Sequence, residues 1–84
     1  MGKINQKRIQ NERKFPHSVE MPGGGRKYWF EITGKSGWKA MYVKEVNASE
    51  ETMRFYQEIY NERGILVEIH EKFPIDKGHK KAGG

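Results

Sequence analysis

The residues best suited to acid–base chemistry gather near the C-terminus of the chain. They are His70, Glu71, Lys72, Asp76, His79 and Lys80. Two imidazoles near a lysine suit the cleavage of RNA, in which one takes the proton of a 2′-hydroxyl and the other protonates the leaving oxygen. His70, His79 and Lys72 are therefore the candidate catalytic residues of a small metal-independent ribonuclease of toxin type. In the alternative interpretation His70 lies on a solvated strand face and His79 in a tail, and neither is catalytic.

The sequence holds no pattern typical of a metal or cofactor site. Its three His are scattered, it has no Cys, and no spacing matches a zinc site. The lack of Cys also excludes a disulfide scaffold and a CxxC redox site. We therefore expect no metal and no cofactor.

The positive charge of the chain is concentrated at its N-terminal end. The protein has 84 residues and a net charge of +5, and the first 27 residues carry a surplus of the same size. The basic residues there are Lys3, Lys7, Arg8, Arg13, Lys14, Arg26 and Lys27. Such a cluster favours anionic partners, and phosphates of nucleic acid are the partners we expect for it.

Composition divides the chain into three segments. Residues 1–25 are poor in apolar side chains and end in Pro22-Gly23-Gly24-Gly25, which predicts a flexible basic arm with a glycine hinge. Residues 26–74 are predicted to form a single β domain, and residues 75–84, rich in Gly and Lys, a flexible tail. No apolar run is long enough to cross a bilayer and no secretory signal is apparent, so we expect a cytoplasmic protein without membrane contact.

Apolar residues in the domain alternate with the period of β-strands. Tyr28, Phe30 and Ile32 fall on one side of the first strand, and Trp29 falls on the other. Gly34-Lys35-Ser36-Gly37 supplies a turn, and residues 38–46 return as the second strand of an antiparallel hairpin. Residues 65–73 are predicted to be the last strand.

The segment 50–63 fits two templates. As a helix it would begin with Ser49 as its N-cap and end at Gly64, with an apolar side turned to the sheet. As a strand it would place Phe55 and Ile59 on one face, with Gly64 at the bulge position of a turn. The strand is favoured because the segment is rich in β-formers. In the register that we expect, Arg54 and Tyr56 then share the outer face with Glu68, His70 and Lys72.

These elements predict a small mainly-β domain, a four-stranded antiparallel meander behind a disordered basic arm. The alternative is an α+β fold of order ββαβ in which residues 50–63 are helical. The terminal Ala82-Gly83-Gly84 resembles the Gly-Gly end of small β-grasp proteins similar to ubiquitin, which implies a carboxylate open to activation. That resemblance covers only the last residues, so no fold or function is transferred from it.

The sequence favours a non-enzymatic protein that binds RNA or single-stranded DNA. The seven basic residues would contact phosphates, assisted by Arg54, and Trp29 and Tyr56 would stack on bases from the outer sheet face. One alternative is the ribonuclease described above. The other is a structural or assembly subunit, in which the same sheet face binds a partner protein or a second copy.

Overall fold

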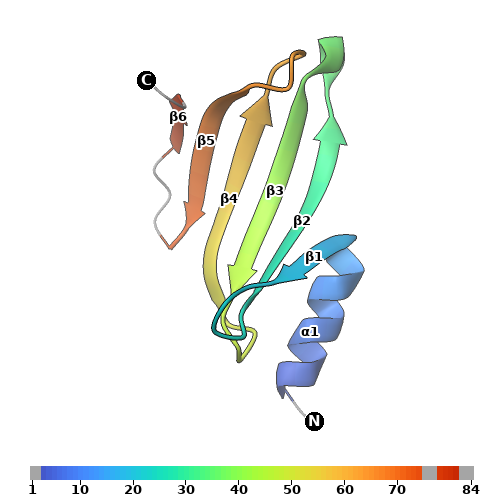
Figure 1. The fold of residues 1–84 in the computed structure, drawn as a ribbon, viewed down its shortest axis with the longest axis vertical. Helices are drawn as coiled ribbons and strands as arrows, with labels where there is room; N and C mark the ends of the chain where they lie inside the picture. The colour runs from blue at the N-terminus through green and yellow to red at the C-terminus, as the bar shows by residue number, and fades with distance from the viewer. Residues whose placement is uncertain (1–2, 75–77, 82–84) are drawn as a thin grey trace.

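The chain folds as one helix followed by an antiparallel sheet whose strands lie in sequence order (Figure 1). This computed structural model describes residues 3–74 and 78–81, with side chains described for residues 4–74. The elements are α1 (Lys3–Lys14), β1 (His17–Glu20), β2 (Arg26–Thr33), η1 (Lys35–Gly37), β3 (Lys39–Val46), β4 (Thr52–Tyr60), β5 (Leu66–Phe73) and β6 (Gly78–Lys81). The predicted small mainly-β domain is confirmed. The meander contains five strands, β1 to β5, with the short β6 beside β5, and not the four that we expected.

The prediction of a disordered N-terminal arm is wrong. Residues 3–14 form α1, which contains no Gly or Pro and has Arg13 and Lys14 in its last turn, where cations stabilise the helix dipole. Residues 17–20 form β1, and the predicted glycine hinge is the tight turn of the β1–β2 hairpin, with Gly23 and Gly24 at positive φ. The helix is held by Phe15, which follows it and packs against Tyr28 in the core.

The predicted C-terminal tail is also partly wrong. Residues 78–81 form β6, which pairs antiparallel with β5. The other residues of that segment, 75–77 and 82–84, lie outside the described residues, as does the Gly-Gly terminus.

The strand interpretation of residues 50–63 is confirmed, and the helical alternative is wrong. Residues Thr52–Tyr60 form β4, which pairs with β3 on one side and β5 on the other. Ser49 caps no helix, because it belongs to a turn in which Asn47 Oδ1 accepts hydrogen bonds from the backbone N–H groups of Ser49 and Glu51 at 2.9 and 3.0 Å. Asn61 organises the β4–β5 turn in the same way.

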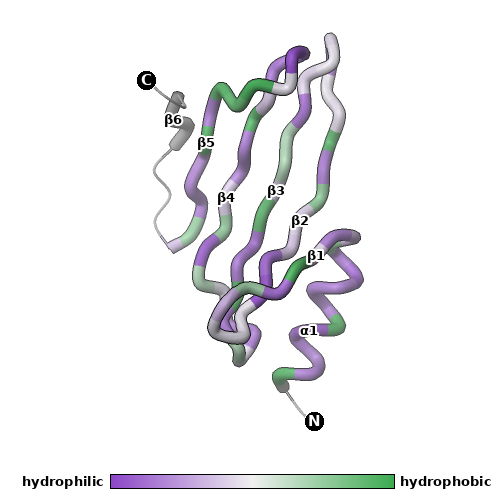
Figure 2. The backbone as a smooth tube through the Cα atoms, viewed as in Figure 1, coloured by the Kyte–Doolittle hydropathy of each residue, from purple (hydrophilic) through white to green (hydrophobic). Residues whose placement is uncertain are grey.

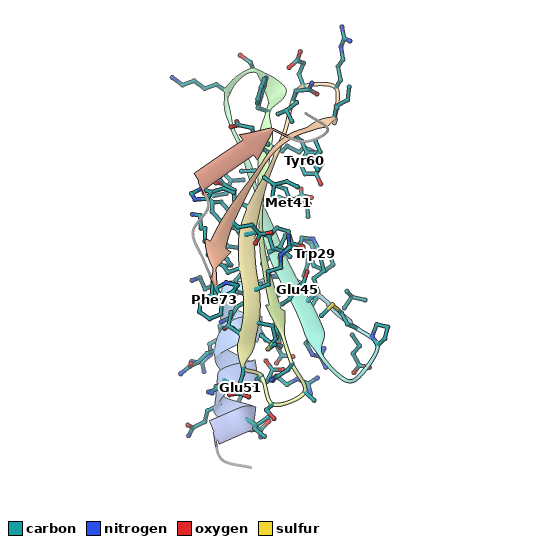
Figure 3. All side chains as sticks on the ribbon, turned by 90° about the vertical axis from the view of Figure 1, so that its left-hand side faces the viewer. Trp29, Met41, Glu45, Glu51, Tyr60 and Phe73 are labelled. Carbon is teal, nitrogen blue, oxygen red and sulfur yellow. The ribbon has the colours of Figure 1, made fainter. Side chains whose placement is uncertain are left out.

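The sheet has two unequal faces. We call the side on which α1 packs the helix face; it carries Tyr28, Phe30, Tyr42, Lys44 and Phe55. The opposite side is the outer face, where Figure 3 shows Trp29, Met41, Glu45 and Tyr60 pointing away from α1. Hydrophobic and hydrophilic residues alternate along much of β2 to β5, whereas α1 is mostly hydrophilic (Figure 2). The buried cluster of Phe15, Tyr28 and Val46 lies between α1 and the sheet.

The expected register between β4 and β5 is wrong by one residue. Ile59 pairs with Glu68 and Tyr60 pairs with Leu66, so a bulge beside the turn adds one residue to β5. A shift of one residue exchanges the faces of a strand. Glu68 and His70 therefore lie on the helix face and not on the outer face with Tyr56. Lys72 joins them, since its Nζ lies 5.1 Å from the ring centre of Tyr42.

Candidate functional site

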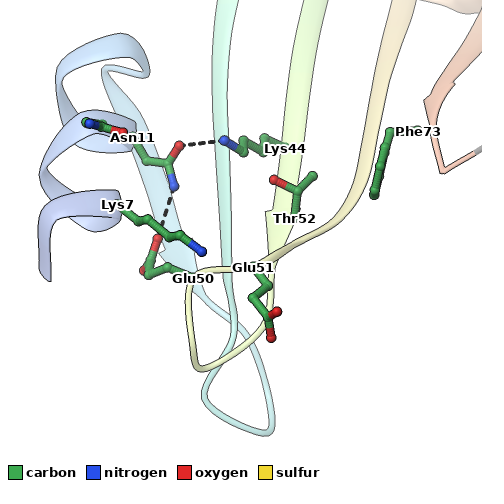
Figure 4. Close-up of a pocket in the computed structure, with 8 residues that line it drawn as sticks. Lys7, Asn11, Lys44, Glu50, Glu51, Thr52 and Phe73 are labelled. Atoms are coloured by element: carbon green, nitrogen blue, oxygen red, sulfur yellow. Dashed lines mark hydrogen bonds between the residues drawn. The ribbon is translucent and has the colours of Figure 1, made fainter. Parts of the chain in front are cut away.

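A groove of about 560 Å³ opens between α1 and the ends of β3 and β4 (Figure 4). It is lined by Lys7, Gln10, Asn11, Lys44, Glu50, Glu51, Thr52 and Phe73. The residues come from the helix, from the three strands β3, β4 and β5, and from the β3–β4 turn, and the packing of Phe15 on the sheet brings these elements together.

Glu50 forms the wall of the groove and is held by several donors. It is 8% exposed and has a φ of 61°, a left-handed conformation that is uncommon outside glycine. The Tyr28 hydroxyl donates to both carboxylate oxygens, at 2.9 and 3.1 Å, and Asn11 Nδ2 donates to one at 3.1 Å. Arg26 Nε lies 4.0 Å from Glu50 Oε1. Burial first, and then the hydrogen bond to Glu50, raises the pKa of Tyr28 to about 12.

Three lysines lie along this groove and the hollow next to it. Lys44 Nζ donates to Asn11 Oδ1 at 2.8 Å, and Lys7 lines the groove beside it. Lys14 lines a second hollow of about 270 Å³ that also borders on Lys44. Burial, and the charges of Lys14 and Lys7, lower the pKa of Lys44. The helix face therefore gathers like charges from α1 and β3 at one place.

An aromatic strip crosses the helix face next to these lysines. The rings of Phe30 and Tyr42 stack with their centres 5.0 Å apart, and those of Tyr42 and Phe55 follow at 6.4 Å. Lys72 Nζ lies 5.1 Å from the centre of Tyr42 and 5.9 Å from that of Phe55. Cations and half-buried aromatic rings are thus interleaved over β3, β4 and β5.

The two histidines that the sequence singled out are direct partners across neighbouring strands. His70 of β5 pairs with His79 of β6, and on its other side with Gln57 of β4. Gln57 donates from Nε2 to the Tyr42 hydroxyl at 3.0 Å. His70 therefore continues the row of Phe30, Tyr42 and Gln57 at the far side of the sheet, on the face that carries Lys72.

The outer face offers less than the sequence suggested. Tyr56 is 5% exposed, and its hydroxyl donates to Glu45 at 3.1 Å. Arg54 lies 4.0 Å over its ring and pairs with Glu71 and Glu45. The expectation of an exposed Tyr56 ring is therefore wrong, because the Arg54 side chain covers it. Trp29 lies on this face as expected, and its ring stacks on that of His17 at 5.5 Å.

The remaining predicted phosphate contacts are scattered. Arg8 pairs with Glu12 along the helix at 3.4 Å, and Arg13 is exposed. Arg26 pairs with Glu20 at 3.3 Å, and Lys27 belongs to the outer face, because its β3 partner is Glu45. Lys3 begins α1, but its side chain lies outside the described residues. Of the seven predicted contacts, the structure brings Lys7 to the groove and Lys14 to the hollow beside it.

Sequence reasoning missed the residues that complete the groove. Asn11 and Glu50 are buried polar residues that contact each other across 39 positions of the chain. Lys44, Tyr42 and Gln57 were not among the predicted site residues. The one available signal was the spacing of Lys7, Asn11 and Lys14, which places them on one side of a helix.

Among the residues that the structure describes, no group of three or more His, Cys, Asp or Glu could hold a metal ion. Within the same ranges no helix is long and apolar enough to cross a membrane. No protein-family model, curated protein or solved structure matches the chain.

Proposed function

We propose that the protein binds single-stranded nucleic acid on its helix face, with phosphates at the lysines and bases along the aromatic strip. The observation that carries this proposal is the position of Lys7, Lys14 and Lys44 along two neighbouring hollows, which share Lys44, Thr52 and Phe73 in their linings. Like charges held close together cost free energy in the folded protein, and a bound polyanion removes that cost.

The chemistry of the neighbouring residues supports a single strand over a duplex. The rings of Phe30, Tyr42 and Phe55 lie beside the lysines, and bases can stack on aromatic rings only when they are unpaired. Lys72 extends the positive charge over these rings. The outer face has a different character, because its Arg54 is paired with two carboxylates.

The test is the fluorescence anisotropy of a labelled oligouridylate titrated with the full chain at low salt. We expect binding by the native protein and weaker binding by the double variant Lys7→Gln, Lys14→Gln, because glutamine keeps the helix propensity and removes one charge from the groove and one from the hollow beside it. The matched control is Arg13→Gln, Lys27→Gln, which loses the same charge away from the groove and should bind as the native protein does.

Two results would contradict the proposal. One is an absence of binding by the native protein. The other is an equal loss of affinity in both double variants, since affinity would then depend on net charge and not on the helix face.

A second candidate function is the cleavage of RNA by His70 and His79, and the cross-strand pairing of these residues favours it. One imidazole would accept the 2′-hydroxyl proton as that oxygen attacks the adjacent phosphorus, and the other would give a proton to the departing 5′-oxygen. The products would be a 2′,3′-cyclic phosphate and a free 5′-hydroxyl. Lys72 lies on the same face and would stabilise the negative charge that develops on the phosphate.

Cleavage is tested with end-labelled RNA in the presence of a metal chelator. We expect cleavage by the native protein, its loss in His70→Ala and in His79→Ala, and its retention in His17→Ala, whose imidazole stacks on Trp29 on the outer face. An RNA with one 2′-deoxy position should resist cleavage at that position. RNA that stays intact with the native protein would exclude this candidate and leave the binding proposal standing.

A further inference from the structure

The helix face has a third hollow, at the end remote from the lysine groove. Its volume is about 200 Å³, and it is lined by Ile32, Gly34, Trp38, Lys39, Ala40 and Ile59. Ile32, Ala40 and Ile59 are direct partners across β2, β3 and β4, so their side chains form one row. Trp38 follows η1 and closes the hollow at the β2–β3 turn.

This hollow is apolar and open to solvent. Trp38 is 39% exposed and Ile32 is 49% exposed. Single exposed apolar residues are ordinary, but here they line a common concave surface, which is typical of a binding site. The aromatic strip of Phe30 and Tyr42 occupies the next row of the sheet.

We propose that this hollow takes one unpaired nucleobase of the bound strand, stacked against the indole of Trp38. The inference rests on the proposed function and adds a specific subsite to it. A planar, uncharged and aromatic group suits an indole flanked by isoleucines, and one stacked base contributes about 1–3 kcal/mol.

The charges around the hollow favour a base over a phosphate. Ile59 pairs with Glu68, so the next position of the same row holds a carboxylate and offers no cation to a phosphate. Lys39 lines the other side, and Lys35 belongs to η1. A phosphate next to the bound base would therefore contact Lys35 and Lys39 at the β2–β3 turn.

The separation of the two sites suits one continuous strand. Ala40 and Lys44 are four residues apart on β3, which corresponds to about 13 Å at about 3.3 Å per residue. A stacked strand advances about 3.4 Å per nucleotide, so about four nucleotides would reach from the hollow to the lysine groove.

The two tryptophans of the chain make the inference testable, because they report on opposite faces. Trp29→Phe leaves Trp38 as the only indole, and Trp38→Phe leaves Trp29 on the outer face. Each variant is titrated with unlabelled oligouridylate while its tryptophan fluorescence is followed, and anisotropy of a labelled oligouridylate measures binding independently. We expect quenching in Trp29→Phe and none in Trp38→Phe.

Trp38→Ala should weaken binding by about 5-fold to 150-fold, and Trp38→Phe, which retains an aromatic ring, should recover most of that loss. Binding by anisotropy without a response of Trp38 would overturn the subsite and leave the proposed function intact. No binding by anisotropy would refute the proposed function itself. A change in Trp38 fluorescence on raising the protein concentration alone would also overturn the subsite, because a second copy would then cover the hollow.

Discussion

Glu50 combines a strained backbone with a buried carboxylate. Its φ is 61°. The β1–β2 and β4–β5 turns have the same backbone hydrogen bonds as the turn of Glu50, and the equivalent residues there are Gly24 and Gly64, both at positive φ. A side chain in the left-handed region costs about 1–2 kcal/mol relative to glycine. The contacts from Tyr28 and Asn11 offset this cost, so the carboxylate holds α1 to the sheet.

We expect Glu50→Ala to destabilise the protein by about 1–3 kcal/mol, because the Tyr28 hydroxyl and the Asn11 amide lose their buried acceptor while the backbone strain remains. Urea denaturation followed by circular dichroism measures the change. Glu62→Ala, in the exposed β4–β5 turn, removes the same charge and should change the free energy of unfolding by less than about 0.5 kcal/mol. Equal effects of the two substitutions would contradict the assignment of Glu50 as a buried anchor.

Tyr28 should make stability depend on alkaline pH. Burial and Glu50 raise its pKa from the ordinary 10.0 to about 12, so the folded state holds the phenolic proton more tightly than the unfolded chain. This stabilisation is complete below pH 10 and is lost as the pH rises through 12. Burial also raises the pKa of Tyr56 and of Tyr60, which act in the same direction.

The matched variant is Tyr28→Phe, which cannot ionise. It should be less stable than the native protein below pH 10, by about 1 kcal/mol for the lost hydrogen bond, and the two stability curves should converge as the pH rises toward 12. Denaturant unfolding over this range measures both curves. Curves that stay parallel would show that Tyr28 does not ionise differently in the folded and unfolded states.

At the scale of elements, α1 shows that composition alone does not predict whether a segment is ordered. Its residues are too polar to bury a whole face, so the sequence predicted disorder. Helix propensity and two anchoring residues, Phe15 and Asn11, are nevertheless enough to hold α1 on the sheet. Phe15 is 3% exposed and packs on Phe30 with ring centres 5.5 Å apart. Asn11 reaches Glu50 and Lys44, and such long-range polar contacts leave no periodic signal in a sequence.

We expect Phe15→Leu to destabilise the protein by about 1 kcal/mol, because leucine retains part of the contact with the sheet. Phe15→Ala would cost about 3–5 kcal/mol, which approaches the whole stability of a small domain, so the leucine variant is the more informative one. Ile9→Ala on the same helix is the control, since Ile9 is 44% exposed and should matter by less than about 0.5 kcal/mol. Denaturant unfolding measures the stability of both variants. An equal loss of unfolding free energy in Ile9→Ala and Phe15→Leu would contradict the packing of α1 through Phe15.

The strands show both what a sequence predicts and what it leaves open. Alternation along residues 28–32 and the turn at Gly64, with its φ of 77°, were predicted and are confirmed. The further bulge between Ile59 and Tyr60, where β5 holds one extra residue, was not predicted, because one extra residue leaves no mark in the composition. Its effect is large: it moves His70 to the helix face, which also carries Lys72, and so decides which residues share the candidate site.

At the scale of the whole molecule, the fold decides where the net charge of +5 lies, because the basic N-terminal segment is part of the folded structure. Lys7 and Lys14 of α1 join Lys44 and Lys72 of the sheet on one face. On the outer face Arg54 is balanced by Glu45 and Glu71. The sequence located the surplus at the N-terminus, and the packing of α1 places part of it against the sheet.

This arrangement predicts a specific dependence of binding on salt. Each phosphate neutralised on a single strand contributes about −0.7 to the slope of log K against log salt concentration, so four lysines in contact would give a slope of about −3. Lys7→Gln, Lys14→Gln should reduce the slope by about 1.4, whereas Arg13→Gln, Lys27→Gln should leave it unchanged. The measurement is a set of anisotropy titrations with labelled oligouridylate at several salt concentrations. An unchanged slope in the first variant would mean that the two helix lysines do not contact phosphates, because a lost contact must release fewer counterions.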